Sequence, residues 1–435
     1  MKKELALDIQ RKVLSNGLRT FAVTQKGILS SHVVLGLRAG ARRENAETNG
    51  IAHFLEHMFF RGGIRYPTQE IISRAIEGVG GNFNAFTGYD KVYFVIGIPV
   101  NKFEVAMDVL SDMLFNAQLR TEDIDAERGA VLQELARRAD DPSSIAWEEL
   151  HKLMYGDTSL GRPIVGPREN LEKFSRPDFV RFRQEMYNAR EAVLAFSGDL
   201  NVKSAYSLAE KYFSGLPRTS SYYGFPDEPI SSSANPEIVI KQKDFAQAII
   251  TLGVSAPAFH SNDRASAIVL DGILGSGMSS RLFQNVRTLK GLAYSVTSDY
   301  GNGHDFGAFV CSAGVSPTKT EEAIQAIALE IRRLMDEPPS ANELQCAKSF
   351  RAGNLAMSSD NVSTILGWLV GSELSYGKAV TPTDAIHDAD NVSRKDVTRI
   401  AQKLFLPGGW KVSIVGPYGG SVETIQDILH TTLIA

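Results

Sequence analysis

The chain has 435 residues, of which 43% are hydrophobic and 22% charged, and this length exceeds what one hydrophobic core usually supports. A formal net charge of −4 and an isoelectric point of about 6.1 leave no basic footprint, so we expect no nucleic-acid partner. The two cysteines give no disulfide framework, and no apolar run is long enough for a signal sequence or a membrane span, so we expect a cytoplasmic protein.

The first half of the sequence alternates between apolar runs typical of strands and patterns with helical spacing. These patterns predict strands at residues 32–37, 92–98 and 192–198, and helices at residues 50–60, 105–114 and 121–137.

A turn-rich segment separates this half from the next. Residues 217–236 are rich in proline and serine, which sustain neither a helix nor a central strand. We therefore expect an N-terminal domain at residues 1–217, a linker at 218–235 and a C-terminal domain at 236–435.

The second half repeats the order of elements of the first. Its patterns predict strands at residues 248–254, 307–311 and 410–416, and helices at residues 265–274 and 321–335. Setting Leu35-Gly36 over Leu252-Gly253 gives a constant offset of 217 positions through the first strand and helix. The repeat favours an α+β fold with two related halves, each a mostly antiparallel sheet with helices packed on one face.

A possible metal site lies in the helix predicted near residue 55. His53 and His57 are four residues apart, so their side chains share one face of the helix, a spacing that lets two imidazoles reach one zinc ion. Glu56 lies on nearly the same face and is placed to act on water at that ion. The alternative is two core or surface histidines on an amphipathic helix.

A catalytic zinc site generally has three protein ligands and an open position. Glu127 and Glu134 are seven residues apart in the helix predicted at 121–137, so they share one of its faces. Each alone is typical of a solvated glutamate, but their neighbours Ala126, Val131 and Leu135 indicate a face that is partly covered.

These residues resemble a known family. An HxxEH motif followed by a glutamate 77 positions after the second histidine is similar to the inverted-zincin peptidases (inverzincins), the group of pitrilysin and the mitochondrial processing peptidase. The resemblance, to the compact single-chain bacterial type, also covers residues 14–19, 50–62, 81–87, 160–166, 278–283 and 291–296.

The resemblance implies a role for each residue of the site. His53, His57 and Glu134 would be the zinc ligands, Glu56 the general base, and Glu127 a carboxylate that supports the site from outside the ligand set. The residues Asn84, Ala85, Phe86 and Thr87 would form an edge strand that pairs with an extended peptide substrate.

The second half contributes a different pair of residues. Arg287 and Tyr294 match, by the same resemblance, a pair that contacts the substrate near the zinc. At the offset of 217, the motif residues correspond to Leu270, Ile273 and Leu274, which cannot bind a metal. We therefore expect one Zn²⁺ per chain.

The expected function is a zinc metalloendopeptidase that hydrolyses extended peptides in an enclosed chamber, as processing peptidases do. A homodimer is the expected assembly, since each chain carries both parts of the site. The alternative is a non-catalytic scaffold or core-type subunit of the same fold.

Overall fold

The computed structural model describes residues 8–218, 224–225 and 235–433. The chain forms two compact units, and each is assembled from separate stretches of sequence. The first unit contains the chain up to Leu135, Pro163–Asp227 and Met357–Thr383, and the second contains Ala136–Arg162, Glu228–Ala356 and the chain from Asp384 onward. Most of the predicted linker at 218–235 lies outside the described residues.

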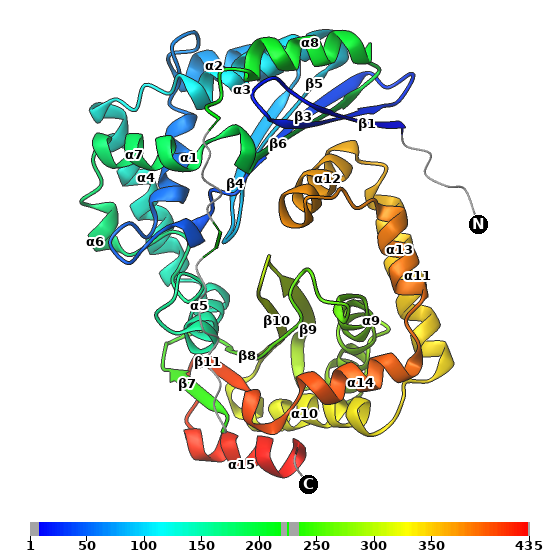
Figure 1. Cartoon of the computed structure of the whole chain (residues 1–435). Coiled ribbons are helices and arrows are strands. Elements are labelled where there is room, and N and C mark those ends of the chain that lie inside the picture. The colour runs from blue at the N-terminus through cyan, green and yellow to red at the C-terminus, as the bar shows by residue number, and fades with distance from the viewer. Residues whose placement is uncertain (1–7, 219–223, 226–234, 434–435) are drawn as a thin grey trace. The chain divides into compact units, whose positions relative to one another are not determined.

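The first unit is built on a six-stranded sheet in the order β1-β2-β6-β3-β5-β4 (Figure 1). All neighbouring strands are antiparallel except β2 and β6, which are parallel. The strands are β1 (Asp8–Val13), β2 (Arg19–Thr24), β3 (Ser30–Leu37), β4 (Asn82–Thr87), β5 (Val92–Pro99) and β6 (Ala192–Gly198).

Helices cover both faces of this sheet. On one face, the apolar side chains of β3 and β5 pack into a core with helices α1, α3, α7 and α8. On the other face, α12 (Val362–Tyr376) packs against β3 and β6. Alternate residues of β3 serve the two cores: Val33 and Leu35 face the first group of helices, and Val34 faces α12. The helices that precede the linker, apart from α5, are α1 (Ile51–Phe59), α2 (Gln69–Ile76), α3 (Phe103–Phe115), α4 (Thr121–Ala139), α6 (Arg168–Leu171), α7 (Arg176–Met186) and α8 (Val202–Phe213).

The second unit is built on a five-stranded sheet in the order β7-β11-β8-β10-β9. Again one neighbouring pair, β7 and β11, is parallel and the others are antiparallel. The strands are β7 (Glu237–Lys241), β8 (Ala248–Ser255), β9 (Ala293–Asn302), β10 (Gly307–Val315) and β11 (Lys411–Val415).

This second sheet is covered in the same way as the first. One face packs into a core with α9, α10, α14 and α15, and α5 packs against β8 and β11 on the opposite face. Helix α5 (Pro142–Tyr155) precedes the linker. The helices that follow the linker, apart from α12, are α9 (Arg264–Leu274), α10 (Thr320–Asp336), α11 (Ala341–Ser358), α13 (Pro382–Asp390), α14 (Arg394–Leu404) and α15 (Val422–Leu433).

The α+β fold and the internal repeat expected from the sequence are both present. Five strands of the first sheet, β2-β6-β3-β5-β4, have the same order and the same single parallel pair as the whole second sheet. The structure adds one feature to the expectation, because each sheet also carries a helix on its second face. These two helices are exchanged in sequence: α5 precedes the linker and packs on the second sheet, whereas α12 follows it and packs on the first.

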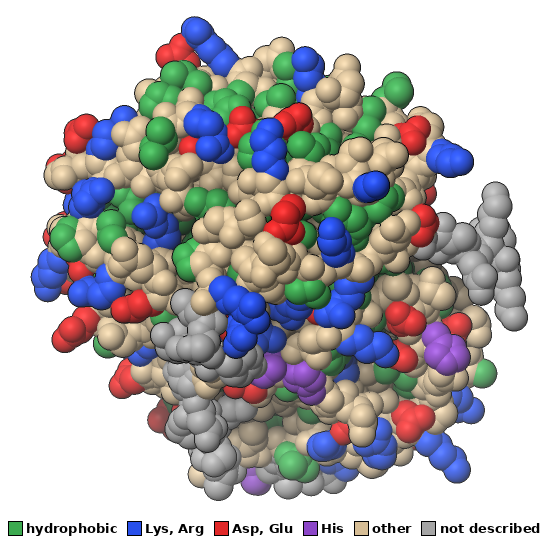
Figure 2. Space-filling view, turned by 45° about the horizontal axis from the view of Figure 1, so that its top comes forward, with side chains coloured by type: hydrophobic (Ala, Val, Ile, Leu, Met, Phe, Trp, Pro, Cys, Tyr) green, Lys and Arg blue, Asp and Glu red, His purple; other side chains and the backbone are tan. Residues whose placement is uncertain are grey.

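The surface carries no strong segregation of charge on the face drawn in Figure 2, where basic and acidic side chains are interspersed. None of the helices in the described part of the chain has the length and hydropathy needed to cross a membrane.

Candidate metal centre

Helix α1 presents its two histidines on one side and its apolar residues on the other. The rings of His53 and His57 are neighbours, with centroids 4.7 Å apart, as expected for residues one helical turn apart. Apolar residues of the same helix, including Phe54 and Met58, are buried in the first core. The apolar residues therefore fix the helix on the sheet, and the histidines project away from the core.

The start of α1 is fixed by tight backbone packing and by a buried carboxylate. Gly50 precedes the helix with a φ of 100°, and a Cβ at this position would lie 2.5 Å from the carbonyl oxygen of Val165, so only glycine fits. Glu44 accepts hydrogen bonds from the backbone N–H groups of Gly50 (2.9 Å) and Ala52 (2.7 Å), which satisfies free N–H groups at the start of the helix.

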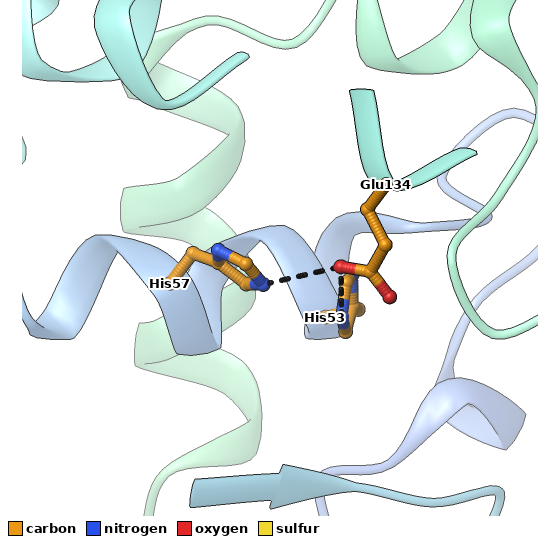
Figure 3. Close-up of side chains that lie close together, drawn as sticks. All are labelled: His53, His57 and Glu134. Atoms are coloured by element: carbon orange, nitrogen blue, oxygen red, sulfur yellow. Dashed lines mark ion pairs between the residues drawn. The ribbon is translucent and has the colours of Figure 1, made fainter. Parts of the chain in front are cut away.

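Glu134 of α4 completes the cluster. One of its carboxylate oxygens lies 3.6 Å from Nε2 of His53 and 3.8 Å from Nε2 of His57, and Figure 3 shows this side chain pointing at both rings. The three ligand atoms all lie within 4.8 Å of one another. Within residues 8–218, 224–225 and 235–433, this is the one group of three or more His, Cys, Asp or Glu side chains with such a geometry.

The arrangement of these atoms fits a zinc ion. Two ligand atoms that each lie about 2.0–2.1 Å from a tetrahedral ion are roughly 3.3–3.4 Å apart. The two separations from Glu134 exceed this value by only a few tenths of an ångström. Two imidazoles and one carboxylate are also a donor set that zinc commonly takes in catalytic sites.

Glu127, two turns before Glu134 on α4, holds His57 in a defined orientation. Its carboxylate lies 2.8 Å from Nδ1 of His57, so Nδ1–H donates and Nε2 is left to face Glu134. Arg61 binds the other oxygen of Glu127. Burial alone favours protonation of Glu127, but the hydrogen bonds from His57 and Arg61 outweigh it and lower the pKa of Glu127.

The same contacts shift the pKa of His57 in the opposite direction. Burial disfavours the charged ring, but the hydrogen bond and charge of Glu127, with the charges of Glu56 and Glu134, outweigh it and raise the pKa of His57. The carboxylates of Glu56, Glu127 and Glu134 thus lie around His57, and negative charge of this kind suits a divalent cation.

Glu56 lies beside the cluster with only 8% of its surface exposed. Burial raises the pKa of Glu56, and the negative charge of Glu134 adds to this, although a hydrogen bond from Thr87 and the charge of His57 act against it. The Thr87 hydroxyl donates directly to one oxygen of the Glu56 carboxylate. A buried, hydrogen-bonded carboxylate next to a group of possible metal ligands is suited to proton transfer.

The segment Asn84, Ala85, Phe86 and Thr87 lies in β4, at the edge of the first sheet. Among the described residues, β4 pairs only with β5. Phe86 is 55% exposed. One side of the strand thus offers backbone hydrogen-bonding groups to a further strand.

Arg287 and Tyr294 lie in the second unit, next to each other. Arg287 belongs to a short helical segment at Phe283–Leu289, and its guanidinium lies 4.6 Å from the ring of Phe283 and 5.9 Å from the ring of Tyr294. Tyr294 is the second residue of β9 and is 75% exposed. The counterparts of the metal motif, Leu270, Ile273 and Leu274, are buried apolar residues of α9.

Sequence reasoning missed two contacts of this site. Arg61 was not singled out, although it continues the four-residue spacing from His53 through His57 and therefore lies on the same face of the helical turn. Thr87 was assigned only to the substrate strand, and its bond to Glu56 links two segments 31 positions apart, a contact that no local pattern signals.

Comparisons with known proteins agree with the geometry. Residues 21–168 match the family model described as insulinase (peptidase family M16), and residues 173–350 match the model described as the peptidase M16 inactive domain. An uncharacterized zinc protease of Rickettsia felis is 30% identical over 393 residues, which cover 90% of this chain and 94% of that protein. An uncharacterized zinc protease of Bacillus subtilis is 28% identical over 411 residues, 94% of this chain and 99% of the relative.

Solved structures show the same fold. A protease from Helicobacter pylori is similar with a TM-score of 0.87 and 20% identity over 94% of this chain and 100% of that one. A peptidase M16 inactive domain from Pseudomonas fluorescens is similar with a TM-score of 0.87 and 19% identity, over 95% of this chain and 100% of that one. From the family models and the relative that is 30% identical along nearly its whole length, this chain belongs to the pitrilysin family of peptidases, family M16, in its compact single-chain bacterial form.

Proposed function

We propose that this protein is a zinc-dependent endopeptidase that hydrolyses extended peptides. The observation that carries the proposal is the convergence of His53, His57 and Glu134, whose ligand atoms lie within 4.8 Å of one another, beside the buried carboxylate of Glu56. The names of the relatives, which are called zinc proteases, support the same activity.

One zinc ion per chain is part of this proposal. His53, His57 and Glu134 would hold it, and the contact between Glu127 and His57 would keep Nε2 of that ring directed at the ion. When bound, zinc supplies a Lewis acid that polarises a carbonyl group and makes water more acidic.

The residues of the chain do the rest of the chemistry. Glu56 accepts a proton from the attacking water as the new C–O bond forms. It then delivers this proton to the amide nitrogen as the C–N bond breaks, so that the products are a carboxylic acid and an amine. Thr87 holds one oxygen of Glu56 through its hydroxyl, which leaves the other oxygen for the proton.

The substrate would bind as an extra strand. The free edge of β4 at Asn84–Thr87 offers backbone N–H and C=O groups to an extended peptide, a general mode of peptide recognition. Arg287 and Tyr294 would contribute by binding substrate backbone and the developing oxyanion. These two roles rest on the family resemblance.

Glu56→Gln tests the mechanism. The amide keeps the shape of the side chain and cannot accept the proton, so the variant should retain one zinc per chain and lose peptidase activity by at least about 10³-fold. Zinc is measured by plasma mass spectrometry, and cleavage by mass-spectrometric mapping of a mixed peptide library. Glu77→Gln, an exposed glutamate outside the site, is the matched control and should retain full activity. Undiminished cleavage by the Glu56→Gln protein would refute the role of Glu56.

A second candidate is a non-catalytic scaffold subunit, and the description of the C-terminal match as an inactive domain favours it. The buried Leu270, Ile273 and Leu274 account for that description, because this half carries no metal motif. The two candidates predict different results for the purified wild-type protein. A zinc peptidase contains zinc and cleaves peptides, whereas a scaffold subunit does neither.

The assembly and the biological role complete the proposal. We expect a homodimer, an enclosed chamber around the substrate and a processing role, in which defined sites of a longer chain are cut. Light scattering coupled to size-exclusion chromatography gives the mass of the particle, and an activity assay on the same fractions shows whether a different partner chain is required.

A further inference from the structure

A cavity of about 220 Å³ lies in the second unit, on the face of the sheet that carries α5. Residues from α5, β8, β9 and β10 line it, and no charged side chain is among them. The lining includes Trp147, Ile249, Thr251, Ser295, Thr297 and Ser312. At roughly 30 Å³ per water molecule, the cavity has room for about seven waters, which corresponds to a leucine or phenylalanine side chain.

The lining selects against charge. Trp147 forms one wall and is 36% exposed, and its ring lies against that of His151, with ring centroids 4.6 Å apart. The hydroxyl of Thr251 already donates to the carbonyl oxygen of Ala146. A carboxylate or ammonium group placed here would find no partner of opposite charge in the lining, whereas an apolar side chain would gain contact with the indole ring.

One strand that lines the cavity is the edge strand of its sheet. Strand β9 is the last strand of its sheet, and within the described residues it pairs only with β10. Ser295 and Thr297 are two residues apart on β9, so both project to the cavity face. A strand added to β9 would place every second side chain on that face, next to the cavity.

The equivalent position in the first unit is filled. Thr251 and Ser312 are direct neighbours on β8 and β10, and the corresponding neighbours on β3 and β5 are Val34 and Val95. These two valines pack against apolar residues of α12. The two sheets thus share a register but differ in whether this face is packed or open.

We propose that this cavity is a specificity pocket: an extended peptide pairs with β9 and inserts one uncharged side chain of leucine or phenylalanine size beside Trp147. The inference rests on the proposed peptidase function and names the class of its substrate. The same strand contains Tyr294, which we assign to substrate binding, so the pocket continues that surface along β9.

Filling the cavity tests the inference. Thr297→Phe places a ring in the pocket from an exposed strand position, and Thr318→Phe adds the same ring at an exposed site outside it. Both proteins and the wild type are assayed with peptides that carry Phe, Leu, Ala, Asp or Lys at each position in turn. At one position, the wild type and Thr318→Phe should prefer Phe or Leu over Ala by about tenfold and over Asp by more, in kcat/KM.

In Thr297→Phe, this preference should disappear, whereas Thr318→Phe should keep it. Trp147→Ala removes the aromatic wall without filling the cavity and should lower the same preference several-fold. An unchanged preference in Thr297→Phe would overturn the pocket and leave the peptidase function intact.

Binding measurements separate the two proposals. If the wild type cleaves no peptide, the peptidase function fails, and the pocket is then tested by fluorescence anisotropy with labelled peptides and the Glu56→Gln protein. A preference for Phe over Asp that Thr297→Phe abolishes supports the pocket, and equal binding of both peptides overturns it.

Discussion

The two halves of the chain build the same sheet and use it differently. In each, a strand leads into a helix on the core face, β3 into α1 and β8 into α9. Three equivalent positions of these helices are a metal motif in the first half and buried apolar residues in the second: His53, Glu56 and His57 against Leu270, Ile273 and Leu274. The comparison shows that a helix at this place in the fold forms without the motif, which agrees with the role in metal binding that we propose for the histidines.

The largest effect on zinc content and activity should come from replacing a residue of the metal motif with its counterpart from the second half. His53→Leu introduces the residue found at the equivalent position of α9 and removes one of the three proposed zinc ligands. Zinc content should fall from one per chain to near zero after dialysis, and peptidase activity should fall by at least about 10⁴-fold, because the Lewis acid is lost.

His32→Leu, on β3 and outside the cluster, is the matched control. It should retain both zinc and activity. Stoichiometric zinc in the His53→Leu protein would show that the three residues are not the ligand set.

The reverse replacement, which puts a residue of the metal motif into the second half, should affect folding stability rather than catalysis. Leu270 is fully buried in the second core, so Leu270→His places a polar ring where no partner is provided and leaves part of the leucine volume empty. The free energy of unfolding should fall by roughly 3–5 kcal/mol, as measured by denaturant unfolding. Zinc content should stay at one per chain, and a second bound zinc would contradict the assignment of this half as non-metal.

A smaller effect is expected one position further along the same helix. Asp271 occupies the place that Phe54 has in α1, and burial raises the pKa of Asp271 to about 6, against hydrogen bonds from Ser276 and Ser298. A carboxyl group with a raised folded pKa gives its full contribution to stability below its unfolded pKa of 3.8, and this contribution is lost as pH rises through about 6.

Asp271→Asn should therefore be more stable than wild type at pH 7, by at most about 3 kcal/mol. The difference should shrink as pH falls and vanish at about pH 3, below the unfolded pKa of 3.8, where the wild-type carboxyl is protonated in both states. Thermal unfolding of both proteins at about pH 3, 5.5 and 7 measures it. A constant difference across this range would show that the carboxyl group titrates normally in the folded protein.

Much of the fold was predictable because it depends on local patterns. The apolar runs that become β3, β5 and β8 stand out between polar loops, and the helical spacing around His53 and Glu134 identified α1 and α4. The matching order of elements also gave the repeat. The ligand set required the family resemblance, since nothing in the spacing alone brings Glu134 to the histidines.

The rest depends on contacts between distant segments. The helix α12 has apolar residues on several sides, among them Leu366, Leu369 and Leu374, so its pattern indicates burial without indicating which sheet it covers. The bonds of Thr87 to Glu56 and of Arg61 to Glu127 likewise depend on how β4 and α4 dock beside α1. Such pairings carry no periodic signal.

The exchange of α5 and α12 limits how far the duplicated halves can be treated as modules. A fragment that stops at residue 217 keeps all six strands of the first sheet but lacks α12. The face formed by Phe21, Val34, Val193 and Ala195, which α12 buries in the intact chain, would then meet solvent and favour aggregation. Each sheet is therefore completed by a helix from the other half of the sequence, so neither half carries all the residues that bury its own sheet.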